Sequence, residues 1–390
     1  MSRGGGRLTI VGAGPAGTAT ALGALAADPT LDVTLVDRAA FPRDKACGDG
    51  IAPHALDVLA EVGVTGLLDD WAPIPVLHLR RGPQLVERTM HRPARVVPRR
   101  VLDARLLDAA VAAGARFVVR RVRGLADVAD AEVVVAADGA HSVLRRELGP
   151  VAGRTGTNAI AVRGYAPTPV DQAGTQRIVF APAEQPAYAW SFDRGDGLAN
   201  VGYGELLRPD RPAPTRRHLM GRLEELLPGS TGAGEDWVGH HLPLSSARWH
   251  PPDGRVLLVG DAARLVNPLT GEGIFYAVAT GVAAGRAAAE AIAAGDPLGA
   301  GRRHREATRP LLARHLQHTA LAARLGRSGR VLEAGLAASA RDQRVFDDLV
   351  EIGLARGRIT PRLAGALVAG LVRPPSRPTV GDVDPVKEHP

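Results

Sequence analysis

The fold is decided by the stretch "LTIVGAGPAGTATALGALAA", residues 8–27. Its β-branched start predicts a strand at residues 8–11, and the small residues from Pro15 onward predict a helix after a glycine turn. A second apolar run, residues 33–36, completes a βαβ unit with the usual spacing. The stretch is uncharged and about long enough to span a bilayer, roughly 20 residues. Its glycines and proline favour a strand and a turn over a membrane helix.

Three glycines between this strand and this helix have the spacing of a dinucleotide-binding turn. Gly12 permits the tight turn, Gly14 lets a pyrophosphate approach the backbone, and Gly17 lets the helix pack close to the strand. The helix N-terminus then presents free N–H groups to the phosphates. Asp37 ends the second strand, where its carboxylate can bind a ribose hydroxyl. We assign two neighbouring residues to the same site: Ala16 and Arg38.

A second turn joins an acid to a glycine directly after a predicted strand. Asp138 and Gly139 follow "AEVVVAA", residues 131–137. Strand ends at this edge of an α/β sheet are where ligands lie. Taken alone, the pattern favours a plain turn followed by a helix that Ser142 caps.

A third turn lies in "GRVLLVGDAARLVNPLTGEGI", residues 254–274. Gly260 and Asp261 end a buried strand there, and the carboxylate is well placed to accept a hydrogen bond from a polyol chain. A long helix is predicted over residues 273–294, and its N-terminus would stabilise the negative charge near N1 of a reduced flavin. The residues that begin this helix complete the turn: Pro268, Gly271, Gly273 and Ile274.

Together the three turns resemble the FAD-binding fingerprints of the para-hydroxybenzoate hydroxylase superfamily of flavoproteins, over residues 7–300. The resemblance implies an α/β fold, with a Rossmann-like FAD-binding domain, an antiparallel β-sheet substrate layer and C-terminal helices. It also implies FAD as the cofactor. Because no second strand–glycine turn–helix unit follows, NAD(P)H or another external reductant is expected to donate electrons without a dedicated domain.

Within that superfamily, "FPRDKACGDG" (residues 41–50) resembles the K-x-C-G-x-G loop of the geranylgeranyl reductase branch. "VRGY" (162–165) and "PAYAWSF…VGYG" (186–204) resemble further motifs of that branch, in which a proline usually stands where this chain has Asp193. The resemblance implies that the loop residues Lys45, Cys47 and Gly48 lie over the isoalloxazine ring and that Arg99 lies close to the flavin.

Cys47 is the only cysteine, so the chain cannot form an intramolecular disulfide. A thiol over the flavin could donate a proton or tune the cofactor, which makes Cys47 a candidate catalytic residue. The alternative is that it is a small buried filler, as free cysteines often are. No metal site is predicted, and a chain without disulfides fits a reducing, cytoplasmic compartment.

The pattern of apolar residues changes along the chain. Residues 159–244 alternate and carry aromatic side chains, which predicts antiparallel strands. Tyr188, Trp190 and Phe192 share one face of such a strand, as the wall of a cavity for an apolar substrate or as a core layer. We predict a discontinuous FAD-binding domain (1–70, 95–158 and 250–300), a substrate-binding domain (71–94 and 159–249), C-terminal helices (301–372) and a disordered tail (373–390).

The 390 residues carry a net charge of +7, but their arginines are scattered and only 4% of residues are aromatic. Nucleic-acid binding is therefore not expected. The expected partner is a hydrophobic small molecule; peripheral membrane contact and the oligomeric state stay open.

The leading hypothesis is an FAD-dependent oxidoreductase that reduces a C=C bond of an isoprenoid, polyene or secondary metabolite by hydride transfer from reduced flavin. The alternative is a flavin-dependent monooxygenase, a hydroxylase or epoxidase, that acts on a hydrophobic or aromatic natural product. The resemblance favours reduction, and Asp193 weakens that preference. The intact acid–glycine turns disfavour a third class, a flavin-binding or basic scaffold protein without turnover.

Overall fold

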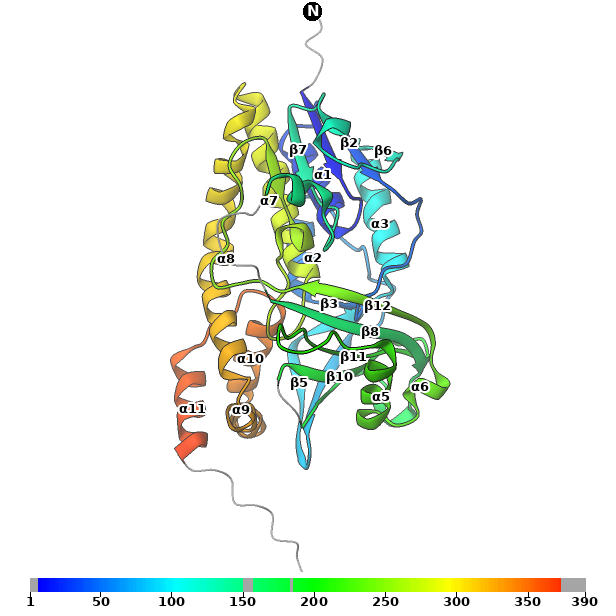
Figure 1. Cartoon of the computed structure of the whole chain (residues 1–390), viewed down its shortest axis with the longest axis vertical. Coiled ribbons are helices and arrows are strands. Elements are labelled where there is room, and N and C mark those ends of the chain that lie inside the picture. Colours follow the sequence, from blue (N-terminus) through cyan, green and yellow to red (C-terminus); the bar gives the residue numbers. More distant parts are fainter. Residues whose placement is uncertain (1–5, 150–156, 183–184, 373–390) are drawn as a thin grey trace, which may run out of the picture.

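The computed structural model describes residues 6–149, 157–182 and 185–372, so the tail predicted at residues 373–390 lies outside the described chain. It contains two β-sheets, drawn one above the other in Figure 1, and the long helix α8 (Ala300–Leu325) runs along one side of both. The upper sheet contains the predicted βαβ unit, and the lower sheet contains the aromatic strands. The predicted α/β class, with a second sheet and C-terminal helices, is confirmed.

The upper sheet is parallel throughout, with the strand order β13-β7-β1-β2-β6. Its strands are β1 (Arg7–Val11), β2 (Asp32–Asp37), β6 (Arg116–Val119), β7 (Val133–Ala136) and β13 (Val256–Leu258). The strand order reverses direction at β1, because β2 and β6 lie on one side of it and β7 and β13 on the other. Ligands of open α/β sheets bind beyond the carboxyl ends of the strands at such a point. Gly12 and Asp138 come just after the ends of β1 and β7.

The lower sheet has the order β12-β8-β11-β10-β9-β4-β5-β3. Its strands are β3 (Gly50–Ile51), β4 (Ile74–Arg81), β5 (Gln84–Val96), β8 (Asn158–Pro167), β9 (Thr175–Phe180), β10 (Ala187–Asp193), β11 (Leu198–Leu206) and β12 (Glu235–Pro243). All neighbours are antiparallel except β4 and β9, which corrects the expected purely antiparallel layer. A hairpin forces antiparallel pairing, but the chain passes through the parallel sheet between β4 and β9, and so long a connection permits the parallel pair.

Two helices bring their N-termini to the same side of the parallel sheet. A Cβ atom at Gly281 of α7 (Ile274–Ala293) would lie 2.4 Å from the Ala16 carbonyl oxygen of α1 (Pro15–Ala27), and one at Gly285 would lie 2.1 Å from that of Thr20. The backbones therefore pack in direct contact, which only glycine allows at these positions. Because residue numbers rise together along the contact, the helices are parallel and both N-termini point the same way.

The remaining helices cover the sheets. They are α2 (Pro53–Ala60), α3 (Arg99–Ala112), α4 (Val143–Glu147), α5 (Arg216–Leu226), α6 (Ser230–Ala233), α9 (Gly329–Arg341), α10 (Gln343–Leu354) and α11 (Pro361–Val372). Helices α9 and α10 pack on β5, where Leu336 and Phe346 contact Val86 and Met90. None of the helices in the described ranges is both long and apolar enough to cross a membrane.

Candidate functional site

A cavity of about 1160 Å³ extends from the carboxyl ends of the parallel strands, past the lower sheet, to the C-terminal helices. Pockets for single small molecules usually measure about 300–1,000 Å³, so this one has room for more than one ligand. Nearly all predicted site residues line it: Gly12, Gly14, Ala16, Asp37, Arg38, Lys45, Cys47, Gly48, Arg99, Asp138, Gly139, Tyr188, Trp190, Phe192, Asp261, Pro268, Gly271, Gly273 and Ile274.

Two predicted residues, Gly17 and Gly260, do not line the cavity but support its wall from behind. A Cβ atom at Gly17 would lie 1.8 Å from the Gly12 carbonyl oxygen, so Gly17 allows helix α1 to contact the turn, as its position predicted. At Gly260 a Cβ atom would press on Ala16 and Ala277, at 3.2 Å from each side chain. The two glycines set the packing of the elements that carry the wall.

Gly14, by contrast, is not required by protein packing. Its φ of −77° suits any residue, and a Cβ atom there would come no closer than 3.5 Å to another protein atom. Helix α1 begins at this point with no side-chain cap and no acid in its first turn. A bare helix N-terminus that faces a cavity is an anion site, since unpaired N–H groups and the helix dipole both favour negative charge.

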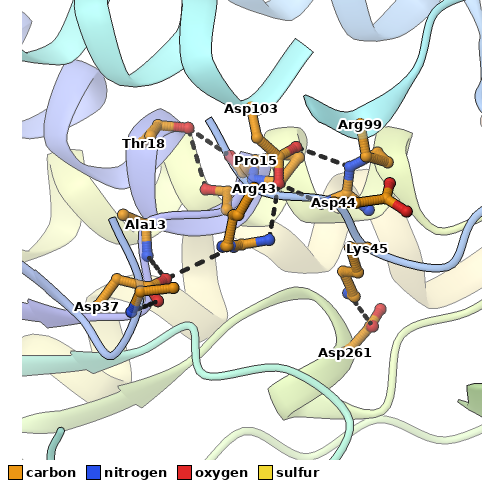
Figure 2. Close-up of polar contacts among 12 residues, drawn as sticks. Ala13, Pro15, Thr18, Asp37, Arg43, Asp44, Lys45, Arg99, Asp103 and Asp261 are labelled. Carbon is orange, nitrogen blue, oxygen red and sulfur yellow. Dashed lines mark hydrogen bonds and ion pairs between the residues drawn. The ribbon is translucent and has the colours of Figure 1, made fainter. Parts of the chain in front are cut away.

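Two arginines lie beside Gly14, and Figure 2 shows both of them directed toward Asp103. Arg99 binds the fully buried Asp103 through two hydrogen bonds of 2.7 and 2.9 Å. Arg43 lies 3.3 Å from the same carboxylate and 3.5 Å from Asp37. Burial works against the charge on Arg99, but Asp103 and the other acidic groups nearby together raise the pKa of Arg99 above its ordinary value. Arg99 therefore stays charged, and the Arg43 guanidinium lies beside it where the turn leaves space for phosphates.

Sequence reasoning missed Arg43, although it lies in the quoted loop before Cys47. The missing information was its distance from the glycine turn, because the loop joins the turn only in the folded chain. Asp37 lies in the position predicted for it, but its oxygens also accept hydrogen bonds from the backbone N–H groups of Ala13 (2.9 Å) and Ala39 (3.0 Å).

The other two acid–glycine turns are joined to each other and to the cysteine loop. Lys45 forms a 3.0 Å ion pair with Asp261 (Figure 2), and Arg145 donates to the backbone carbonyls of Asp261 and Ala262 at 3.2 and 2.9 Å. Ser142 caps helix α4, as the structural alternative for this turn predicted. Asp138 accepts a 2.7 Å hydrogen bond from Val143 through one oxygen, while its other oxygen is buried without a partner among the described residues.

These features fit FAD. The N-terminus of α1, which has no side-chain cap, and the two arginines beside it suit the pyrophosphate. The Asp138 oxygen that has no partner among the described residues lies at the cavity wall and can accept a hydrogen bond from the cofactor. The N-terminus of α7 lies at the cavity wall, where the Glu272 carboxylate accepts a hydrogen bond from the Phe275 N–H. Gly12, Gly14, Asp37, Asp138 and the start of α7 would hold the cofactor.

The Cys47 loop is held from below by a buried polar network. Asp49, with a φ of +59°, accepts hydrogen bonds from Tyr165 (2.6 Å) and Asn200 (2.8 Å). Asn200 also donates to the Cys47 carbonyl (2.9 Å) and accepts from Trp190 (2.8 Å). A left-handed conformation is costly for aspartate and persists only where its surroundings enforce it. The network therefore fixes the height of the loop above the lower sheet.

These anchors explain two motifs that the sequence offered only as a resemblance. In "VRGY", Arg163 binds the Asp44 carboxylate and Tyr165 binds Asp49. Directly before the "VGYG" of the second motif, Asn200 supplies the link to Cys47. None of these residues was predicted as part of the site, because each acts across more than 100 residues of sequence. Their places inside or beside the resemblance motifs were the only sequence signal that could have assigned them to the site.

Among the ionisable groups of the cavity wall, Cys47, Asp49 and Glu272 have raised pKa values. Burial raises the pKa of the Cys47 thiol to about 11, so it stays protonated at neutral pH. Burial also raises the pKa of Asp49 to about 6, and that of Glu272 to about 7 although the backbone N–H of Phe275 donates to it at 2.8 Å. Glu272, which sequence reasoning also missed, can hold or release a proton near neutral pH.

Tyr188, Trp190 and Phe192 form a continuous aromatic wall of the cavity. Neighbouring ring centroids are 6.0 and 6.4 Å apart, and Phe180 extends the row at 6.3 Å from Tyr188. Asp193 does not line the cavity: it accepts hydrogen bonds from Thr168 (2.9 Å), Gly174 (2.7 Å) and Gly195 (3.1 Å). The replacement of the usual proline by Asp193 therefore ties loops together and leaves the aromatic wall intact.

The fold and this cavity define an FAD-binding oxidoreductase. Residues 117–298 match a family model described as an FAD binding domain. The chain is 36% identical to a menaquinone reductase of Mycolicibacterium smegmatis over 74% of its own length and 76% of that protein. It is 32% identical to digeranylgeranylglycerophospholipid reductase 2 of Methanopyrus kandleri, over 74% and 78%. The chain belongs to the geranylgeranyl reductase branch of the FAD-dependent oxidoreductases, as its cysteine loop predicted.

Solved structures of similar fold extend over almost the whole chain. A geranylgeranyl bacteriochlorophyll reductase-like protein from Thermoplasma acidophilum matches with a TM-score of 0.69 at 20% identity, covering 94% of this chain and 96% of that one. A flavoprotein/dehydrogenase from Cytophaga hutchinsonii gives a TM-score of 0.70 at 17% identity, with coverage of 93% and 99%. At these identities the likeness concerns the fold.

Proposed function

We propose that this enzyme reduces a C=C bond in the isoprenoid chain of a hydrophobic substrate. The observation that carries the proposal is the apolar arm of the cavity. Beyond the aromatic wall the cavity continues between the lower sheet and the C-terminal helices, where its lining is largely aliphatic and aromatic: Leu77, Leu79, Met90, Ile178, Phe180, Leu332, Leu336, Phe346, Leu349 and Leu367. An apolar arm suits a polyprenyl chain, because the hydrophobic effect favours burial of CH₂ and CH₃ groups and does not depend on their orientation.

The relatives support the same substrate class. The names of the menaquinone reductase and the digeranylgeranylglycerophospholipid reductase both denote reduction of an isoprenoid compound. Because the two substrates named differ in the head group, we propose that this enzyme recognises the part they have in common, the isoprenoid chain. An external reductant, NAD(P)H or another donor, would return the electrons.

Saturation of a C=C bond needs a hydride on one carbon and a proton on the other. Reduced FAD, when bound, supplies the hydride. In this chain Trp190 and Tyr188 would hold the isoprenoid chain against the flavin face, and the loop at Gly48 would allow close approach. Glu272 is the acid on the cavity wall whose pKa, near 7, suits proton delivery, and the protonated Cys47 thiol lies close enough to interact with its charge.

The test is an anaerobic half-reaction. The FAD-loaded protein is reduced with dithionite, a polyprenyl quinone or a geranylgeranyl lipid is added, and the flavin absorbance is followed together with the mass of the lipid. Reoxidation without oxygen, with a gain of two mass units per bond, is expected. Reoxidation only after oxygen is admitted, with an oxygenated product, would instead establish the monooxygenase. A protein that takes up no FAD would contradict both.

A further inference from the structure

Exposed apolar side chains gather at one end of the C-terminal helices. Among the described residues, ten large hydrophobic side chains are classed as exposed, and five of them lie at the end of α8 or on α11. We call these five the apolar rim: Leu321 (47% exposed), Leu325 (41%), Val368 (61%), Leu371 (44%) and Val372 (74%). The other five lie singly on other elements, as exposed apolar residues usually do.

The helices bring the members of the apolar rim together. A Cβ atom at Gly370 would lie 3.1 Å from Ala334, and one at Gly335 would lie 3.6 Å from Leu367, so α11 runs antiparallel to α9. The end of α11 therefore lies beside the start of α9, which follows the end of α8 after a short turn. Ala322 of α8 packs in the same cluster as Leu367, which places the end of α8 against α11.

The cavity reaches the surface at this rim. Leu325 lines the cavity and is also 41% exposed. Gly326, Val331 and Leu367, which lie beside the apolar rim, line the cavity as well. The apolar arm thus reaches the apolar rim at Leu325, at the opposite end from the glycine turn.

Positive charge lies beside the apolar rim, at the end of α8 and the start of α9. Arg324, Arg327 and Arg330 are exposed, and within the described chain none of them forms an ion pair or a side-chain hydrogen bond. The neighbouring acid, Glu333, is already paired with Arg81 at 3.3 Å. Arginines that surround exposed aliphatic side chains match an anionic lipid surface, where the side chains enter the acyl boundary and the guanidinium groups meet phosphate.

We propose that the apolar rim and its three arginines dock the enzyme on the surface of an anionic bilayer, so that an isoprenoid chain passes from the lipid directly into the cavity. The delivery of substrate rests on the proposed function, but the docking does not. Val368, Leu371 and the arginines make no part of the described cavity wall, so docking and turnover can be disrupted separately.

The experiment is sedimentation of the FAD-loaded full chain with vesicles. Binding is expected to vesicles of phosphatidylcholine with phosphatidylglycerol, to weaken as salt rises, and to be much weaker with phosphatidylcholine alone. Replacement of the rim residues, Val368→Asp with Leu371→Asp, should release the protein from the vesicles. The matched control, Val170→Asp with Leu298→Asp, changes side chains that are 95% and 71% exposed elsewhere and should leave binding unchanged.

A second variant does not depend on apolar packing. Reversal of the three arginines to glutamate should weaken binding to anionic vesicles by about tenfold or more. The same reversal at Arg217, Arg248 and Arg309, which are exposed and distant, should have a smaller effect. If the wild-type chain stays in the supernatant with both vesicle types, or if both sets of variants lose binding equally, the docking proposal is wrong.

Other occupants of the rim would give different results. A dimer detected by light scattering that Leu371→Asp dissociates would show that a second copy covers the rim. Vesicle binding that appears only after deletion of residues 373–390 would show that this segment covers it. Turnover of a short, detergent-dispersed isoprenoid tests the proposed function by itself: rim variants should keep it, and its loss in the wild type would leave the vesicle result standing.

Discussion

The two ends of the cavity are constructed in different ways. At the dinucleotide end, short turns with fixed spacing place Gly14, Asp138 and Asp261 beside two helix N-termini. At the apolar end, the wall combines side chains from strands and helices far apart in the chain, such as Met90, Phe180 and Phe346. The first end depends on backbone conformation, and the second depends on packing. Substitutions should therefore act on different quantities at the two ends.

The largest effect is expected at Gly17, where backbone meets backbone. In Gly17→Ala the new methyl group would lie 1.8 Å from the Gly12 carbonyl oxygen, so helix α1 must move away from the turn. The free energy of unfolding should fall by about 3 kcal/mol or more, measured by urea denaturation. Gly221→Ala is the matched control, because no atom lies within 4 Å of the new methyl group in helix α5. That variant should gain about 0.5–1 kcal/mol.

Gly14→Ala should separate cofactor binding from folding. The backbone at Gly14 suits alanine, and its nearest neighbour would be 3.5 Å away, so the stability of the cofactor-free chain should change by less than about 0.5 kcal/mol. The methyl group would occupy the space that we assign to the pyrophosphate, and the dissociation constant of FAD should rise about 100-fold, or about 2.7 kcal/mol. Equilibrium titration with FAD measures it. Unchanged affinity would place the pyrophosphate elsewhere.

The same contrast explains what could be predicted from the sequence. The βαβ unit, the three turns and the aromatic strand were recognisable, because local spacing determines each of them. The parallel pairing of β4 with β9 was not, since it depends on how the chain returns after a long excursion. The roles of Arg43, Asn200 and Glu272 also escaped prediction, although all three stand inside or beside quoted motifs. The partners of Arg43 and Asn200 lie in other segments, and the burial that raises the pKa of Glu272 comes from the folded chain.

Asn200→Ala, which loosens the Cys47 loop, should lower the free energy of unfolding by an intermediate amount. Asn200 is fully buried, and its loss would leave the Trp190 N–H and the Cys47 carbonyl without their partners. Unpaired buried polar groups cost about 1–3 kcal/mol, so unfolding should become about 2 kcal/mol easier. Substrate-dependent reoxidation should slow as well. Tyr165→Phe removes only one hydrogen bond to Asp49 and should cost about 1 kcal/mol. Equal losses in both variants would contradict the role given to Asn200.

Glu272→Gln should have the smallest effect on stability and on FAD affinity. It should instead change how the rate of flavin reoxidation depends on pH. The pKa of Glu272 is raised to about 7, and only the protonated carboxyl group can donate. The rate of reoxidation by an isoprenoid substrate should therefore fall as pH rises through about 7, toward tenfold for each further pH unit. Glu272→Gln should remove this dependence and lower the rate at pH 6, while FAD stays bound.

Cys47→Ala is the matched control for the proton donor, since it changes the neighbouring group on the same wall. The pKa of the Cys47 thiol is near 11, so the thiol stays protonated throughout this pH range and its loss cannot remove a titration near 7. A slower rate with the pH profile retained would make Cys47 a second contributor, and an unchanged rate would leave it a filler. A pH profile that disappears in Cys47→Ala but persists in Glu272→Gln would reverse the assignment of the acid.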